Sequence, residues 1–195
     1  VESRQAKLYL ELSDPLTEPK VAAHLQADGV SAGDLTLDRA VMTAEGGSSG
    51  LDVALDLAAG ALDASTKGRV AVADDETRIE IASLSARHAQ IRAALAKPAR
   101  ITFAQDVVLI DGLVLQAEGG RLSLDGRYGN RSDMNLTISG VPLELVRLAA
   151  PDLELSGRLD GGARLTGTRA EPRASGDLIV TGLTLPAFRQ AGIAG

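Results

Sequence analysis

Residues 122–126 read Leu122-Ser123-Leu124-Asp125-Gly126, and residues 136–140 repeat the pattern as Leu136-Thr137-Ile138-Ser139-Gly140. The pattern returns as Leu153-Glu154-Leu155-Ser156-Gly157 and, more weakly, as Ala163-Arg164-Leu165-Thr166-Gly167. Because side chains along a β-strand alternate between two faces, the apolar residues and the glycine of each copy share one face, and the polar residues take the other. This stretch predicts a series of β-strands that each have one apolar face.

The same alternation extends through the first half of the chain. Its cleanest example is 51–57, where Leu51, Val53, Leu55 and Leu57 fall on one face and Asp52, Ala54 and Asp56 on the other. A glycine- and serine-rich loop at 46–50 precedes this strand, and turn residues at 74–76 and at Asp160-Gly161 predict hairpins. The whole chain is therefore expected to be all-β and rich in antiparallel pairs.

Two segments differ from the rest. Residues 142–149 predict the one short helix, because Pro142 suits a first helical turn and Pro151 prevents its continuation. Residues 84–95 fit either a helix or a strand. The alternation of Ile91, Ala93 and Leu95 with more polar neighbours favours the strand.

The composition indicates a thin sheet and excludes several classes of protein. Of 195 residues 45% are hydrophobic, yet only 2% are aromatic and neither Trp nor Cys occurs, so aliphatic residues must supply the apolar surface. The net charge of −6 and the pI near 5.0 disfavour nucleic-acid binding, which needs a basic surface and often aromatic rings. No apolar run approaches the roughly 20 residues of a membrane-spanning helix.

The sequence has no cluster of catalytic or metal-binding side chains. Its two histidines, His24 and His88, lack a second histidine at helical spacing, so neither a metal site nor a cofactor is expected. Most acidic residues fall at turns and on outer strand faces, where they keep one face hydrated and discourage aggregation of the sheet. The chain is therefore not expected to be an enzyme.

The chain shows no internal domain boundary. The unequal spacing of the repeated pattern argues against a solenoid with a fixed rung length. The sequence begins at Val1 rather than Met and opens without a signal-like apolar stretch. We therefore expect residues 1–195 to be a single fragment of a longer protein, with any membrane anchor outside the fragment.

A sheet of a dozen or more strands with one apolar face must cover that face. The single expected helix is too short to do so, which leaves a closed sandwich, a closed barrel, or a curled sheet whose inner face meets a ligand. The shortage of aromatics argues against a sandwich core about 10 Å thick. Gly126, Gly140, Gly157 and Gly167 fall in phase with the apolar face and would open space or permit bending there. Taken alone, the residues still favour a dry sandwich core over a trough.

Between Pro98 and Gly182 a series of short motifs occurs in a fixed order. They are Pro98-Ala99-Arg100-Ile101-Thr102-Phe103, Val107 to Leu115 with Asp111-Gly112-Leu113, Gly119-Gly120-Arg121-Leu122-Ser123-Leu124-Asp125-Gly126, Val141-Pro142-Leu143-Glu144-Leu145, Pro151-Asp152-Leu153 through Gly157, Leu165-Thr166-Gly167-Thr168, and Pro172 before Ser175-Gly176. With these motifs, residues 98–182 resemble the TamB family of the AsmA-like superfamily, whose conserved region is the translocation and assembly module domain. Residues 1–97 share the repetitive style but carry no signature of their own.

The resemblance implies a β-taco, a long sheet curled into a U-shaped trough with an apolar interior. Members of the family are anchored in the inner membrane of Gram-negative bacteria and lie in the periplasm. They pair with an outer-membrane barrel protein of the TamA type, and they move phospholipid or help to insert outer-membrane proteins. The resemblance implies no catalytic residue.

The function expected from the resemblance is that of a periplasmic module whose apolar groove conducts phospholipid between the two membranes, supports outer-membrane protein assembly, or both. Two alternatives stay open. One is a structural or adhesive β-sandwich or β-solenoid without lipid, and the other is a chaperone-like module that offers strand edges to outer-membrane protein strands. If the groove binds acyl chains, its expected lining is Leu51, Val53, Leu55, Leu57, Val70, Val72, Ile79, Ile81, Ile101, Phe103, Leu113, Leu115, Leu122, Leu124, Leu136, Ile138, Leu153, Leu155, Leu165, Leu178 and Val180.

Overall fold

The computed structural model describes residues 2–14, 19–32, 35–73, 75–88, 91–143 and 156–184. These residues form one antiparallel sheet of thirteen strands, which confirms the expected all-β class. The strands are β1 (Glu2–Ser13), β2 (Lys20–Ala32), β3 (Leu35–Gly47), β4 (Gly50–Ala59), β5 (Leu62–Ala73), β6 (Glu76–His88), β7 (Ile91–Leu95), β8 (Ala99–Ala104), β9 (Val107–Ala117), β10 (Gly120–Tyr128), β11 (Ser132–Pro142), β12 (Ser156–Gly167) and β13 (Pro172–Thr184).

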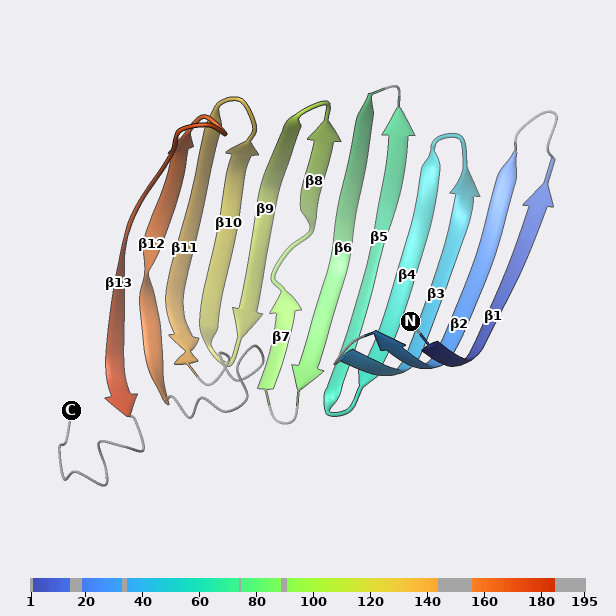
Figure 1. The fold of residues 1–195 in the computed structure, drawn as a ribbon, viewed down its shortest axis with the longest axis horizontal. Helices are drawn as coiled ribbons and strands as arrows, with labels where there is room; N and C mark the ends of the chain where they lie inside the picture. The colour runs from blue at the N-terminus through green and yellow to red at the C-terminus, as the bar shows by residue number, and fades with distance from the viewer. Residues whose placement is uncertain are drawn as a thin grey trace.

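The strands follow one another across the sheet in the order of the sequence (Figure 1). The exception is β8, which continues the line of β7, since both strands pair with β6 on one side and β9 on the other. The described strands leave β1 and β13 as two open edges that do not pair with each other. The described strands therefore form an open sheet.

The sheet is curled rather than flat. In Figure 1 the lower ends of β1–β3 turn and run across the front of the other strands, so the front of the sheet is its inner side. A long antiparallel sheet twists and coils in this way unless stacking holds it flat. The described sheet is therefore curled toward this inner side at its β1–β3 end (Figure 1).

Two bulges of the same design shape the sheet. Gly112 in β9 has a φ of 69°, and Gly140 in β11 has a φ of 57°, both in the left-handed region that glycine tolerates best. The N–H of Gly112 donates a 2.8 Å hydrogen bond to Oδ1 of Asp125, and the N–H of Gly140 donates a 2.7 Å hydrogen bond to Oδ1 of Asp160. In both cases an aspartate on the next strand accepts the hydrogen bond from a backbone group that the bulge removes from the ladder.

The Asp160-Gly161 hairpin predicted from the sequence is wrong, because both residues lie inside β12. Asp160 is held there by its bond to Gly140. Gly161 is required for close packing, since a Cβ on it would collide with the carbonyl oxygen of Asp177 on β13. An Asp-Gly pair therefore marks a neighbouring bulge here rather than a turn.

Three other local expectations have mixed outcomes. Residues 84–88 and 91–95 are strand, as favoured, in β6 and β7. The helix expected at 142–149 does not begin at Pro142, which ends β11 in register with Arg158; residues 144–149 lie outside the described part. A proline is tolerated at a strand end, and it holds the preceding residue extended. The loop at 46–50 is shorter than expected, because only residues 48–49 separate β3 from β4.

The described residues have almost no dry core. The buried apolar side chains among them are Ala44, Ala99, Val114 and Leu143, and none of these is fully buried. The chain exposes 13048 Å², whereas a compact protein of 20.1 kDa exposes about 8,700 Å². The sandwich favoured by the residues taken without the resemblance is therefore not formed by the described strands, which lie in a single layer.

Candidate functional site

The strand register gives the sheet two chemically different faces. We call the apolar face the one that carries Leu51, Val53, Leu55 and Leu57 of β4, and the polar face the one that carries Asp52 and Asp56. Residues paired across neighbouring strands share a face. Pairing followed from strand to strand places the other described residues of the expected lining on the apolar face: Val70, Val72, Ile79, Ile81, Ile101, Phe103, Leu113, Leu115, Leu122, Leu124, Leu136, Ile138, Leu165, Leu178 and Val180. Leu153 and Leu155 lie outside the described residues.

One row of the apolar face consists almost entirely of large aliphatic side chains. We call it the leucine row, and from β1 to β13 it is formed by Leu8, Leu25, Met42, Leu55, Thr66, Leu84, Leu95, Leu115, Leu122, Ile138, Gly161 and Leu178. Directly opposed residues have Cβ atoms about 4.5–5.5 Å apart, so the side chains of the row touch in succession. The row is a nearly unbroken apolar band along the axis of the trough.

A second row beside it consists almost entirely of alanine. This alanine row is Ala6, Ala27, Ala40, Leu57, Ala64, Ala86, Ala93, Ala117 and Gly120. It lies two residues along each strand from the leucine row, a step of about 6.6 Å. Short side chains beside long ones leave a shallow channel that runs parallel to the leucine row.

The apolar face is almost free of charge. From β4 to β13, the described residues on this face include no Asp, Glu, Lys or Arg. Its polar side chains there are Thr66, Thr77, His88, Tyr128 and Ser132. No second layer of described structure covers the face.

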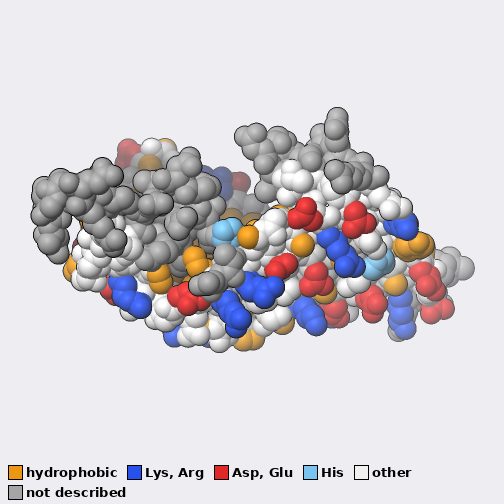
Figure 2. All heavy atoms as spheres, turned by 90° about the horizontal axis from the view of Figure 1, so that it is seen from below, with side chains coloured by type: hydrophobic (Ala, Val, Ile, Leu, Met, Phe, Trp, Pro, Cys, Tyr) orange, Lys and Arg blue, Asp and Glu red, His pale blue; other side chains and the backbone are white. Residues whose placement is uncertain are grey.

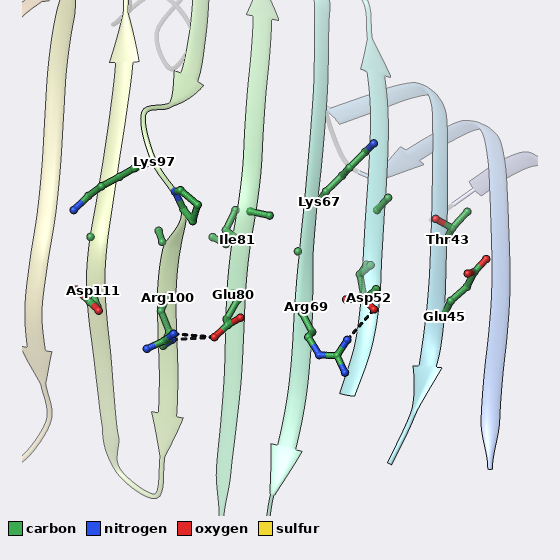
Figure 3. Close-up of a pocket in the computed structure, with 17 residues that line it drawn as sticks. Thr43, Glu45, Asp52, Lys67, Arg69, Glu80, Ile81, Lys97, Arg100 and Asp111 are labelled. Carbon is green, nitrogen blue, oxygen red and sulfur yellow. Dashed lines mark hydrogen bonds and ion pairs between the residues drawn. The ribbon is translucent and has the colours of Figure 1, made fainter. Parts of the chain in front are cut away.

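The polar face carries ion pairs between neighbouring strands. Arg69 and Asp52 approach to 2.8 Å, and Arg100 and Glu80 approach to 2.9 Å, as Figure 3 shows. Similar pairs join Arg87 to Asp63 at 2.8 Å and Arg164 to Asp133 at 2.9 Å. All of these side chains are well exposed, so the pairs keep the face hydrated and help to set register but contribute little stability.

In the pair between Arg164 and Asp133, the guanidinium binds both carboxylate oxygens. Nε and Nη2 of Arg164 donate hydrogen bonds to the two carboxylate oxygens of Asp133, at 3.0 and 2.9 Å. These bonds lower the pKa of Asp133 below its ordinary value and raise the pKa of Arg164 above its own. The pair therefore joins β11 to β12 at any neutral pH.

The marked depressions of the described surface lie on the polar face. One of about 770 Å³ is bordered by Lys67, Arg69, Glu80, Arg100 and Asp111, whose side chains rise from the strands between β5 and β9 (Figure 3). It is an open gap between rows of long charged side chains of both signs. An acyl chain placed there would desolvate charges without compensation, so this depression is not a candidate lipid site.

The two faces differ plainly in chemistry. Figure 2 views the sheet along its strands and shows Lys, Arg, Asp and Glu side chains gathered toward one margin of the described part. This charged margin corresponds to the polar face. The candidate functional site is the opposite, apolar face of the sheet.

A contact that the sequence did not suggest joins three hairpin ends at one edge of the sheet. Arg169, in the turn after β12, donates a 2.7 Å hydrogen bond to the carbonyl oxygen of Asp106, in the turn after β8. Its guanidinium also lies 5.6 Å from the centre of the Tyr128 ring, at the end of β10. Three hairpin ends are thereby linked along one rim.

Several residues of the apolar face were missing from the expected lining. Leu8, Leu25, Met42, Leu84 and Leu95 all belong to the leucine row. The alternation that marks Leu8, Leu10 and Leu12 is visible in the sequence. What the sequence does not give is the register that aligns these strands with β4.

The described residues contain no helix long and apolar enough to cross a membrane. Within the same ranges, no group of three or more His, Asp or Glu side chains is placed to hold a metal ion. Comparison with known proteins identifies no relative: no family model matches the chain, and no curated protein and no solved structure is significantly similar to it. The geometry of the apolar face must therefore carry the functional argument.

Proposed function

We propose that the chain is a lipid-conducting module whose apolar face binds the acyl chains of phospholipids and lets them move along the trough. The observation that carries this proposal is the apolar face, which no described strand covers and whose described residues are continuous across the sheet and free of charge from β4 to β13. In water such a face is unfavourable unless something apolar covers it. Acyl chains are a suitable cover because they gain about 0.8 kcal/mol for each methylene buried.

The dimensions of the sheet suit a conduit. The path has twelve successive strand positions, and at about 4.8 Å per strand it spans roughly 55 Å. The leucine row repeats nearly the same side chain at each step. An acyl chain that slides by one strand therefore exchanges one set of aliphatic contacts for another. Movement along the row therefore meets no deep trap and no charged barrier.

The cellular setting of the proposal comes from the resemblance of residues 98–182 to the TamB family. In that setting the chain lies in the periplasm, as part of a protein anchored in the inner membrane, and passes phospholipid toward an outer-membrane barrel partner of the TamA type. Support for outer-membrane protein assembly follows from the same placement. These statements rest on the quoted sequence motifs, while the binding of acyl chains rests on the apolar face.

Photocrosslinking on the two faces of one strand tests the proposal. A photoreactive residue in place of Leu55 points into the trough, whereas one in place of Asp56 occupies the next position of β4 and points away from it. We expect capture of co-purified phospholipid at residue 55 and little at residue 56. Equal capture at the two positions, or a purified chain that shows no phospholipid by native mass spectrometry, would contradict the proposal.

A further inference from the structure

Two arginines lie directly opposite each other on the polar face, near the end of β6 and the start of β7 at the lower margin of the sheet (Figure 1). Arg87 of β6 pairs in register with Arg92 of β7, so their Cβ atoms lie about 4.5–5.5 Å apart. Like charges in this position are destabilising. In every other described strand pair, an arginine or lysine that is opposed to a charged residue faces a carboxylate. Arg87 and Arg92 are thus the one pair of opposed cations in the described sheet.

Two carboxylates bond to this pair of residues and leave most of its side-chain donors free. Oδ2 of Asp63 accepts a 2.8 Å hydrogen bond from Nη2 of Arg87, whose Nε and Nη1 have no bond to any described residue. Oε1 of Glu118 accepts a 3.0 Å hydrogen bond from the backbone N–H of Arg92 rather than from its side chain. The guanidinium of Arg92 has no hydrogen bond or ion pair within the described ranges, so all of its donors remain available.

The pair borders a depression of about 690 Å³ on the polar face, which extends across the strands from β3 to β7. Arg39 lines its far side, three strand spacings from Arg87 along the same row of the sheet, or about 14 Å. Ser65 and Ser85 also line the depression, and their hydroxyl oxygens lie 2.8 Å apart in a hydrogen bond. Cationic and hydroxyl donors therefore surround one recess.

The recess carries an excess of positive charge. Its charged side chains are three arginines and two aspartates, in a chain whose net charge is −6. One of these aspartates, Asp63, is already bonded to Arg87. The depression of about 770 Å³ described above differs, because its lysines and arginines are matched by an equal number of Asp and Glu side chains. Excess positive charge and unbonded guanidinium donors favour an oxyanion ligand.

From these features we propose that the recess lined by Arg39, Arg87 and Arg92 binds a phosphate group. A phosphate between Arg87 and Arg92 accepts hydrogen bonds from both guanidinium groups and offsets the repulsion between them. It has enough oxygens to serve both forks at once, whereas a carboxylate has only two. The site lies on the face opposite the leucine row, so it does not depend on acyl-chain binding in the trough.

Titration with inorganic phosphate, followed by NMR of the arginine Nε–Hε groups, tests the site. We expect a saturable shift at Arg87 and Arg92 that chloride at the same ionic strength does not produce. Arg92→Gln should weaken phosphate binding at Arg87 about tenfold. The matched control is Arg100→Gln, which removes an arginine of the same face that is opposed to Glu80 and Asp111, and it should leave the shift unchanged. Equal weakening by the two variants, or a shift that chloride reproduces, would overturn the proposal.

Thermal denaturation gives an independent measurement. Without phosphate, Arg92→Gln should unfold at a higher temperature than the unsubstituted chain, because it removes the repulsion with Arg87. Phosphate should raise the unfolding temperature of the unsubstituted chain and have little effect on that of Arg92→Gln. An equal rise in the two proteins would contradict a site at Arg92. Leu124→Asp, which disturbs only the apolar face, should respond to phosphate as the unsubstituted chain does.

Two sources could supply the phosphate group, a soluble phosphate ester or the headgroup of an anionic phospholipid at a membrane surface. Binding of glycerol 3-phosphate, without any effect of Arg92→Gln on co-sedimentation with phosphatidylglycerol vesicles, would assign the soluble ester. Co-sedimentation with these vesicles that falls in Arg92→Gln but not in Arg100→Gln, and that is absent with phosphatidylcholine vesicles, would assign the headgroup. If neither probe distinguishes Arg92→Gln from Arg100→Gln, the proposal is wrong.

Discussion

Replacing Leu124 by aspartate should expel lipid from one part of the trough and leave the rest occupied. Leu124 lies on the apolar face of β10, between Leu113 of β9 and Leu136 of β11. An aspartate there would place a carboxylate among aliphatic side chains and against a bound acyl chain. The partial loss of its water costs roughly 3 kcal/mol when lipid occupies the position, which corresponds to about a hundredfold lower local occupancy.

Photocrosslinking measures this effect where it occurs. With a photoreactive residue in place of Leu136, which pairs directly with residue 124, Leu124→Asp should reduce phospholipid capture at least tenfold. Leu55 on β4 lies five strand spacings from residue 124 on β10, or about 24 Å. With the photoreactive residue at position 55, phospholipid capture should be unchanged by Leu124→Asp. The matched control is Ser123→Asp, which adds the same charge on the polar face of the same strand.

Ser123 is a better control site than Asp125, because the carboxylate of Asp125 accepts the hydrogen bond from the bulge at Gly112. Repeating the capture at a pH low enough to protonate the new carboxyl should restore much of the signal. The reasoning is refuted if Ser123→Asp reduces capture at residue 136 as strongly as Leu124→Asp does. It is also refuted if the loss extends equally to residue 55.

Three further predictions concern the sheet itself. Asp160→Ala leaves the N–H of Gly140 without its acceptor and should lower the free energy of unfolding by about 1–3 kcal/mol, measured by urea titration. Asp160→Asn keeps an acceptor and should lower the free energy of unfolding less. Gly126→Ala should destabilise the chain by about 1–3 kcal/mol or prevent folding, because Gly126 has a φ of 133° and a Cβ there would collide with the Asp133 carbonyl oxygen. At Gly60 a Cβ meets nothing within 4 Å, so Gly60→Ala should destabilise the chain less. Since the pKa of Asp133 is lowered, its pairing with Arg164 contributes above the ordinary carboxyl pKa of 3.8 and disappears as the pH falls through the lower folded value. Carboxyl-carbon NMR should show Asp133 titrating below that ordinary value, and Arg164→Gln should raise its pKa toward it.

The sequence predicted the two faces well because alternation is a local property. Leu51, Val53, Leu55 and Leu57 reveal their shared face without knowledge of any other strand. The leucine row could not be predicted, because it exists only once the register of each hairpin is fixed. Register depends on turn length and on bulges, and a shift of one residue would move a whole strand to the opposite face.

The bulges also explain where the sequence misled. Asp160-Gly161 has the form of a hairpin turn, but its aspartate binds the N–H of Gly140 and its glycine lets β13 approach. Gly112 interrupts an apolar run, yet β9 continues through it, since Asp125 accepts the hydrogen bond from the displaced backbone. In both cases the deciding partner lies on another strand, beyond the reach of local patterns.

Without the family resemblance, the sequence favoured a sandwich despite its few aromatics, because an apolar face is usually covered by protein. A leucine that packs against a second sheet and one that faces a ligand have the same alternating sequence pattern. The described strands form a single layer, and this arrangement depends on how far the sheet curls. Curl arises from the summed twist of many strands, which no short stretch of sequence encodes.

A sheet in which each strand touches only its two neighbours has a consequence for how the molecule unfolds. With almost no central core, its stability is close to a sum of nearest-neighbour terms, as in a linear array of repeats. Hairpins at the two ends should detach before those in the middle, so hydrogen exchange should be fastest in β1 and β13 and slowest near β6 and β9. The same property would allow a hairpin to be inserted or deleted with little effect on distant strands, and the length of the trough could then change without redesign of its wall.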